Sequence, residues 1–179
     1  VIIALVPALA ASVWLFGPRA LIVNIVSVVS CVLFEYVTRK ILKRRNTLSD
    51  LSAVVTGLLL AFNLPSTIPM WMIPIGAFVA IVVVKQFFGG IGQNFANPAI
   101  TARIVLMVSF ASRMTNWVAP FWYKEGADAV ASATPLVADP NTYSYMDLFL
   151  GLRSGCLGET CVLALLVGGL YLICLKIIN

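Results

Sequence analysis

The sequence predicts an all-α integral membrane protein, a multi-span helical bundle that includes short broken or re-entrant helices. Of its 179 residues, 61% are apolar and only 11% are charged, whereas soluble domains have roughly 45–50% apolar and about 25% charged residues. The apolar residues also gather in six runs. This composition argues against a soluble enzyme, a nucleic-acid-binding protein and a disordered tail.

The apolar runs differ in length, and they comprise residues 1–16, 20–38, 51–64, 70–88, 99–112 and 156–175. The second, fourth and sixth are long enough to span a bilayer, which takes about 20 residues. The third and fifth hold about 14 residues, or about 21 Å of helix, which is short of a hydrocarbon core of about 30 Å. Both chain ends lie at or inside apolar runs, so we expect a portion of a longer protein.

The two short runs are interrupted by helix-breaking residues. The third ends at Asn63-Leu64-Pro65, and the fifth is entered through a glycine-rich stretch at 89–94 and Asn97-Pro98. Such interruptions are tolerated in a membrane where protein buries them or where they line a cavity. We therefore predict broken helices near 51–64 and 89–112.

Five of the twelve basic residues lie together between the second and third runs, at Arg39, Lys40, Lys43, Arg44 and Arg45. Basic loops face the cytoplasm, so the loop 39–50 is expected there and the loop 113–155 on the opposite side. The predicted organisation is then membrane helices over 1–112, an extracytoplasmic loop over 113–155 and a further membrane helix over 156–179. Because so long a connection usually has a function, the loop is where chemistry is sought.

Within that loop, residues 128–136 read Asp-Ala-Val-Ala-Ser-Ala-Thr-Pro-Leu. Pro135 favours an extended backbone at Thr134, and Ala133 leaves room for a large group to approach the Thr134 hydroxyl. The stretch can therefore present that hydroxyl for modification. On spacing alone, an ordinary proline-containing turn is the simpler interpretation.

This stretch resembles the flavinylation motif of the RnfD/NqrB family, in which the final threonine carries FMN through a phosphoester bond. The resemblance implies covalent FMN on Thr134, which makes the chain a phosphoprotein, and recognition of the motif by a flavin transferase. The implied cofactor-binding residues are Asp128, Ser132, Ala133, Thr134, Pro135 and Leu136. Ser132 stands where the family often has glycine.

Three further stretches, at residues 47–61, 85–99 and 109–117, are similar to other signatures of the same family. The resemblance runs over essentially the whole chain and is closer to the RnfD branch than to the NqrB branch, whose chains carry a longer leader. It implies one half of a urea-transporter-like repeat.

The function implied by the resemblance is a flavin-carrying subunit of a redox-driven Na⁺ or H⁺ pump in a ferredoxin:NAD⁺ oxidoreductase complex of a bacterial or archaeal cell membrane. Its partners would be other membrane and flavoprotein subunits, a flavin transferase and the lipid bilayer, with no nucleic acid. A second, non-covalent flavin is compatible with this implied function. The alternatives are an NqrB-type subunit of a Na⁺-translocating NADH:quinone oxidoreductase and a urea-transporter-like permease without a redox role.

Several polar residues in or beside the apolar runs are further candidates. Asn97 either caps a helix or contacts a flavin, with capping favoured, and Arg103 could bind a flavin phosphate or an acidic partner. Lys85 is expected to snorkel to the cytoplasmic interface, and Glu35 to pair with Arg39 four residues later. The sequence has no histidine, and its four cysteines match no iron–sulfur or zinc signature, so no metal site is predicted.

Overall fold

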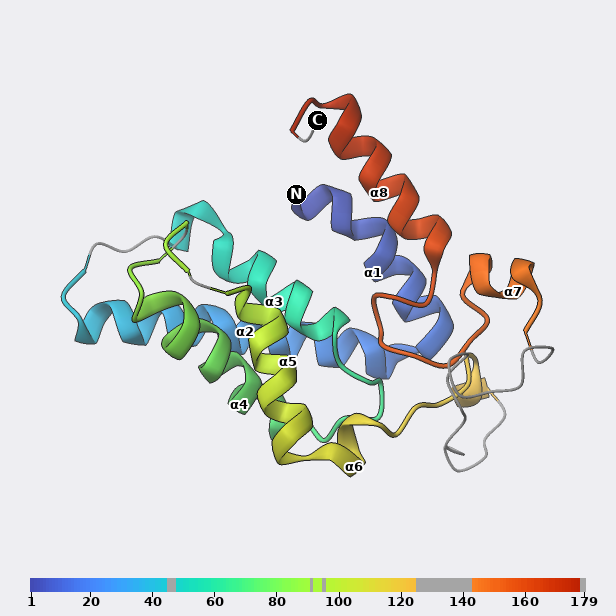
Figure 1. The fold of residues 1–179 in the computed structure, drawn as a ribbon, viewed down its shortest axis with the longest axis horizontal. Coiled ribbons are helices and arrows are strands. Elements are labelled where there is room, and N and C mark those ends of the chain that lie inside the picture. The colour runs from blue at the N-terminus through green and yellow to red at the C-terminus, as the bar shows by residue number, and fades with distance from the viewer. Residues whose placement is uncertain (45–47, 91, 95, 125–142, 178–179) are drawn as a thin grey trace. The chain divides into compact units, whose positions relative to one another are not determined.

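The computed structural model describes residues 1–44, 48–90, 92–94, 96–124 and 143–177, and every regular element within them is a helix (Figure 1). The longer helices are α1 (Ile2–Phe16), α2 (Pro18–Ile41), α3 (Ser52–Phe62), α4 (Met72–Phe78), the π-helix η2 (Val79–Gln86), α5 (Pro98–Ser109) and α8 (Val162–Cys174). Short helices are η1 (Leu48–Asp50), α6 (Ala111–Met114), η3 (Trp122–Lys124) and α7 (Tyr145–Leu150). The prediction of an all-helical chain is confirmed.

One helix in the described part of the chain, α2 with 24 residues, is both long and apolar enough to cross a membrane. This confirms the second predicted span. The fourth and sixth runs form shorter helices than predicted, Met72–Gln86 and Val162–Cys174. In the sixth run, residues 156–161 are not helical. The Arg153 guanidinium donates hydrogen bonds there to the carbonyl oxygens of Glu159 and Thr160.

The chain divides into two compact units, and the larger contains residues 22–64 and 68–115. In this unit α3 packs closely on α2, because a Cβ added at Gly57 would lie 2.7 Å from the Val28 Cα atom. The Ser27 hydroxyl donates a 2.7 Å hydrogen bond to the Gly57 carbonyl at the same crossing. Glycine at position 57 therefore allows the backbones of α2 and α3 to approach each other.

The other unit contains residues 1–21, 65–67 and 116–179, and its main contact is between α1 and α8. A Cβ at Gly168 of α8 would collide with the Ala4 carbonyl oxygen of α1. At the end of α1, the Phe121 N–H donates to the Leu15 carbonyl at 2.7 Å and the Tyr123 hydroxyl to the Trp14 carbonyl at 3.0 Å. The chain is thus held against α1 shortly before residue 125.

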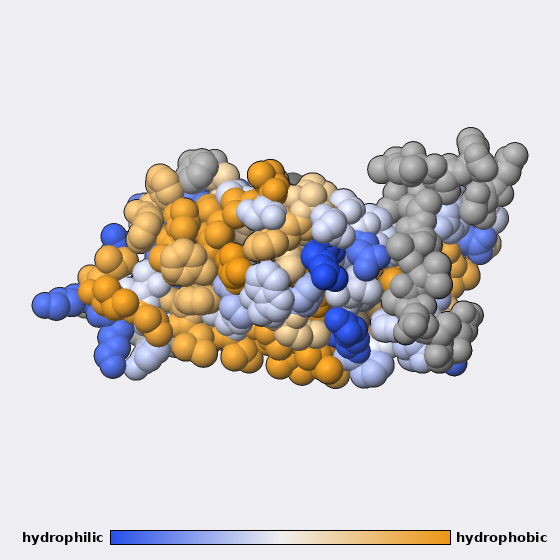
Figure 2. Space-filling model, turned by 90° about the horizontal axis from the view of Figure 1, so that it is seen from below, coloured by the Kyte–Doolittle hydropathy of each residue, from blue (hydrophilic) through white to orange (hydrophobic). Residues whose placement is uncertain are grey.

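Large apolar side chains are exposed along several helices, and Figure 2 shows apolar residues over much of the face that it presents. Val29 of α2 is 53% exposed, and Val108 of α5 is 81% exposed. Soluble monomers rarely expose apolar patches of large area. These surfaces fit contact with lipid or with another protein segment.

Candidate functional site

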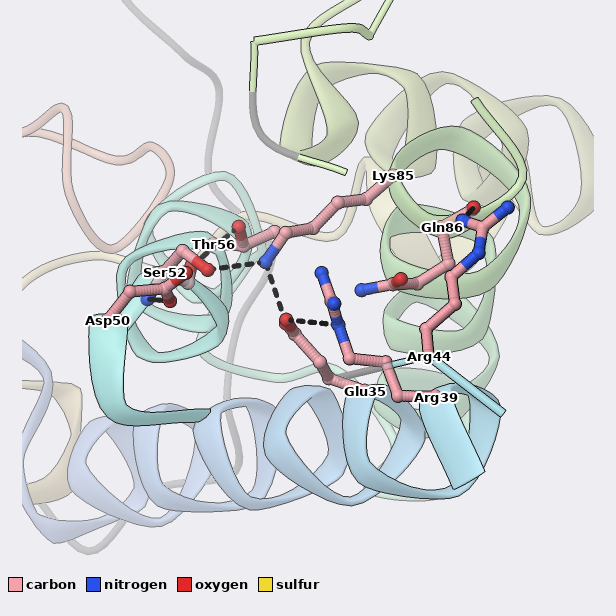
Figure 3. Close-up of polar contacts among 8 residues, drawn as sticks. All are labelled: Glu35, Arg39, Arg44, Asp50, Ser52, Thr56, Lys85 and Gln86. Carbon is pink, nitrogen blue, oxygen red and sulfur yellow. Dashed lines mark hydrogen bonds and ion pairs between the residues drawn. The ribbon is translucent and has the colours of Figure 1, made fainter. Parts of the chain in front are cut away.

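A cluster of charged and polar side chains lies inside the apolar unit formed by residues 22–64 and 68–115, where α2, the start of α3 and η2 meet (Figure 3). Glu35 comes from α2 and Lys85 from η2, and they are 0% and 1% exposed. Charges removed from water are costly unless they are paired and hydrogen-bonded. Each of these two charges therefore needs a partner inside the unit.

The Lys85 ammonium makes two short contacts with groups from other helices. Its Nζ atom donates to Glu35 Oε2 at 2.6 Å and to Ser52 Oγ at 2.7 Å, and Figure 3 shows it placed between those two side chains. The prediction that Lys85 snorkels to the interface is therefore wrong. A buried carboxylate offers this ammonium a closer partner than water at the membrane surface.

Arg39 supplies the second positive charge of the cluster. Its Nε atom lies 3.5 Å from Glu35 Oε1, which confirms the predicted pairing one helical turn apart on α2. Glu35 thus contacts two cations, one on each carboxylate oxygen, and the group formed by these three residues has a net positive charge.

The same end of η2 is bound to the chain that follows α2. Arg44 Nη1 donates a 2.9 Å hydrogen bond to the Gln86 backbone carbonyl. The Gln86 side chain is fully buried, and neither its amide nitrogen nor its amide oxygen has a hydrogen-bond partner in the described part of the chain. The cluster therefore holds unused hydrogen-bonding capacity next to its charges.

A carboxylate at the edge of the cluster lies outside the membrane-spanning segments. Asp50 Oδ1 accepts a 2.9 Å hydrogen bond from the Ser52 N–H. Burial tends to raise the pKa of Asp50, but the hydrogen bonds from Ser52, with the charges of Lys85 and Arg39, outweigh it and lower the pKa from 3.8. Asp50 is therefore a stable anion at neutral pH.

The backbone that carries Lys85 is unusual. Residues Val79–Gln86 form a π-helix of eight residues. π-Helical turns are rare in proteins, and those that occur often lie at functional sites. Lys85 and Gln86 lie at the end of this helix, with both side chains buried. An ammonium in contact with a carboxylate pairs a proton donor with an acceptor. Through its bonds to Glu35 and Ser52, the Lys85 ammonium also joins η2 to α2 and α3.

Of the residues predicted to hold a cofactor, six lie outside the described residues. They are Asp128, Ser132, Ala133, Thr134, Pro135 and Leu136. The segments on either side are described. Before the loop, Phe121 and Tyr123 form hydrogen bonds with α1. After it, Ser144 is the N-cap of α7, in a capping box where its side chain accepts a hydrogen bond from the Met146 N–H.

The two other predicted residues lie on α5. Asn97 is its N-cap, and its side-chain oxygen accepts hydrogen bonds from the N–H groups of Ala99 and Ile100, which confirms the capping interpretation. Arg103 Nη1 donates a 3.0 Å hydrogen bond to Asn63 Oδ1. Arg103 thereby links α5 to the residue that ends α3.

Sequence reasoning missed the pairing of Lys85 with Glu35 and Ser52. The available signal was an acidic and a basic residue that each lie within an apolar run. Charged residues inside a membrane usually pair with one another. On that basis, an ion pair between Glu35 and Lys85 could have been predicted.

Comparison with known proteins gives a family match over the whole chain. The model of the NQR2, RnfD, RnfE family matches residues 1–179. A similar relative is a subunit of the Na(+)-translocating ferredoxin:NAD(+) oxidoreductase complex of Acetobacterium woodii, at 48% identity over 100% of this chain. The counterpart from the proton-translocating complex of Clostridium ljungdahlii is 42% identical, also over 100% of this chain.

A more distant relative belongs to the ion-translocating oxidoreductase complex of Rhodobacter capsulatus, at 37% identity over 100% of this chain. The chain spans 57% of the length of the first two relatives and 59% of the third. All three relatives are named as subunits of ion-translocating oxidoreductase complexes.

Proposed function

Because this chain belongs to the NQR2, RnfD, RnfE family, we propose that it is part of a flavin-carrying membrane subunit of a redox-driven Na⁺ or H⁺ pump. The complex would be a ferredoxin:NAD⁺ oxidoreductase, the activity for which two of the relatives are named. Their identity over the full chain favours this activity over the NADH:quinone alternative.

The observation that carries the proposal is the position of Thr134 in a flavinylation-like motif of a chain that matches the family throughout. Thr134 would hold FMN through a phosphoester bond, and Asp128 and Ser132 would guide the flavin transferase. FMN supplies the electron-transfer chemistry. The protein's part is to fix the carrier at the membrane surface, which covalent attachment does without loss of cofactor during turnover.

The anchoring of the chain before the motif supports this role. The Phe121 and Tyr123 hydrogen bonds to α1 fix the chain just before the loop that contains Thr134, and the capped helix α7 follows it. In the proposed arrangement, the loop lies outside the cytoplasm, where electrons pass between neighbouring subunits.

The wider architecture of the proposal is a multi-pass bundle that forms one half of a urea-transporter-like repeat. The short helices α3 and α5, with 11 and 12 residues, fit paired broken helices of such a repeat. Asn97, the N-cap of α5, and Arg103 on α5 are further proposed flavin contacts. A second, non-covalent flavin is compatible with the proposal.

The test is in-gel fluorescence of the denatured subunit from cells that contain the flavin transferase. We expect a flavin-fluorescent band for the wild type and none for Thr134→Ala, while Thr142→Ala, a threonine of the same loop outside the motif, stays fluorescent. Mass spectrometry of the peptide that contains Thr134 should show the added mass of FMN less water. A colourless wild-type band would refute the flavin role and favour a permease.

A further inference from the structure

The surface of α2 carries a groove that the buried charged cluster does not use. The groove has a volume of about 340 Å³ and is lined by Val28, Val29, Val32, Leu33 and Tyr36. From residue 28 to residue 36 it follows the helix for about 12 Å. We call it the α2 groove.

The α2 groove is apolar and partly open. Val29, Leu33 and Tyr36 are 53%, 56% and 46% exposed, and Tyr36 is the one lining residue with a polar group among the described residues. Its position on the helix that is long enough to cross a membrane gives it access to the hydrocarbon region. A hydrocarbon chain fits this lining, whereas a soluble polar metabolite does not.

The α2 groove leads towards a group of cations at the end of α2, which we call the basic end: Lys40, Lys43 and Arg44. All three are exposed. The Lys40 Nζ atom lies over the ring of Tyr36, 5.9 Å from its centroid, so the basic end begins where the groove stops. Figure 2 shows hydrophilic side chains gathered at the left of the view, where α2 terminates, next to apolar surface.

The backbone at the basic end is fixed by a Schellman motif. The Arg44 N–H donates to the Arg39 carbonyl at 3.0 Å and the Lys43 N–H to the Lys40 carbonyl at 3.3 Å. Lys43 has a φ of +51°, the left-handed conformation for which glycine is preferred. A lysine therefore stands at a position where the backbone favours glycine, and its charge adds to that of its neighbours.

We propose that the α2 groove and the basic end form a binding site for one anionic phospholipid. An acyl chain lies in the groove against the three valines, Leu33 and Tyr36, and the headgroup phosphate is bound by Lys40, Lys43 and Arg44. Basic residues beside a membrane span attract anionic lipid, and here an apolar groove adds a place for the acyl chain. The proposal concerns α2 and the residues that directly follow it, and it does not depend on a flavin.

The chain offers a matched control for the headgroup contact. Lys176 also follows an apolar helix, is exposed, has a φ of +53° and lies in a Schellman motif, with the Ile177 N–H bonded to the Leu172 carbonyl. It therefore shares the residue type and the backbone geometry of Lys43. It follows α8 and does not lie at the end of the groove.

The experiment uses the complete subunit in its complex, delipidated and reconstituted with phosphatidylglycerol or phosphatidylcholine, with bound lipid counted by native mass spectrometry. We expect one retained phosphatidylglycerol and a weaker signal for phosphatidylcholine. Loss of two cations near the membrane surface in Lys40→Gln/Lys43→Gln should lower the phosphatidylglycerol affinity by about 30-fold, whereas Lys176→Gln should leave it unchanged. Free glycerol phosphate should not compete, because it lacks the acyl chain.

A second variant tests the groove without changing any charge. Val32→Trp fills the groove and should also release the lipid, and a photoreactive phenylalanine analogue at Val32 should cross-link to lipid. Equal binding by the double lysine variant and the wild type would overturn the proposal. So would cross-linking to another protein segment, which would show that a helix covers the groove. In-gel flavin fluorescence of the same samples reports separately on Thr134.

Discussion

Lys85 and Glu35 are separated by 50 positions in the chain and are brought into contact by folding. Their ion pair is almost entirely buried, with side chains 1% and 0% exposed. In such a pair the cost of burial falls on both charges and is offset only while both are present. Removing one partner of this pair should therefore cost more folding free energy than removing one partner of an exposed ion pair.

We predict that Lys85→Met destabilises the subunit by about 3–5 kcal/mol, because it leaves the Glu35 carboxylate buried with less compensating charge. Adding Glu35→Gln should recover part of that loss, so the two substitutions are not additive. Thermal unfolding of the detergent-purified complex measures this, with Lys176→Met as the exposed control. Additive effects of the two substitutions would contradict the assignment of a coupled pair.

Asp50 gives a prediction of pH dependence. Burial acts to raise its folded pKa, but the hydrogen bonds from Ser52 and the charges of Lys85 and Arg39 together outweigh burial and lower the pKa from 3.8. The carboxylate therefore stabilises the fold above about pH 3.8. This contribution is lost as the pH falls through the folded pKa. The difference in unfolding temperature between wild type and Asp50→Asn should be present at about pH 5 to 7, where the carboxylate is ionised, and shrink below about pH 3.8. If the difference in unfolding temperature between wild type and Asp50→Asn does not change with pH, the role assigned to the Asp50 carboxylate is wrong.

At the scale of elements, helix contacts depend on a few glycines. Gly168 and Gly169 are neighbours on α8, yet a Cβ at Gly168 would meet the Ala4 carbonyl oxygen of α1, while one at Gly169 would meet nothing within 4 Å. The two positions therefore separate the packing role of glycine from its effect on helix propensity.

We predict that Gly168→Ala forces α1 and α8 apart and lowers the unfolding temperature, because a backbone atom occupies the place of the added methyl group. Gly169→Ala should be neutral or stabilise by about 0.5–1 kcal/mol through the better helix propensity of alanine. Differential scanning fluorimetry of both variants is the measurement. Equal effects would show that α1 and α8 do not pack through Gly168.

At the scale of the whole molecule, the distribution of basic residues predicts which loops face which side of the membrane. The basic segment after α2 is expected in the cytoplasm, and the loop that contains Thr134 is expected on the opposite side.

We predict that, in a background without the four native cysteines, Thr142→Cys reacts with a membrane-impermeant maleimide added to intact cells. Lys43→Cys should react only after the cells are opened. Both are polar positions between apolar runs, so each controls for the reactivity of the other. Reaction of Lys43→Cys in intact cells would reverse the orientation and place Thr134 in the cytoplasm.

How much of the structure the sequence could predict depends on how far apart in the chain the interacting residues lie. The span at α2, the short helix α3, the Asn97 cap and the Glu35–Arg39 pair follow from patterns within a few residues and are confirmed. The predicted lengths of the fourth and sixth helices are wrong. In the sixth run, residues 156–161 are not helical and their carbonyl oxygens at Glu159 and Thr160 accept hydrogen bonds from Arg153. A hydropathy profile carries no information about such side-chain hydrogen bonds.

By itself the sequence determined that the chain is helical, that it is suited to a membrane, and that Thr134 lies in a stretch that resembles a family motif. These properties reside in composition, local period and short motifs. Only the tertiary structure decided that Lys85 turns inward to Glu35 and Ser52, and that the α2 groove ends beside the Lys40 ammonium. The direction of a long side chain is set by how helices are rotated and crossed. That depends on contacts between residues far apart in the chain.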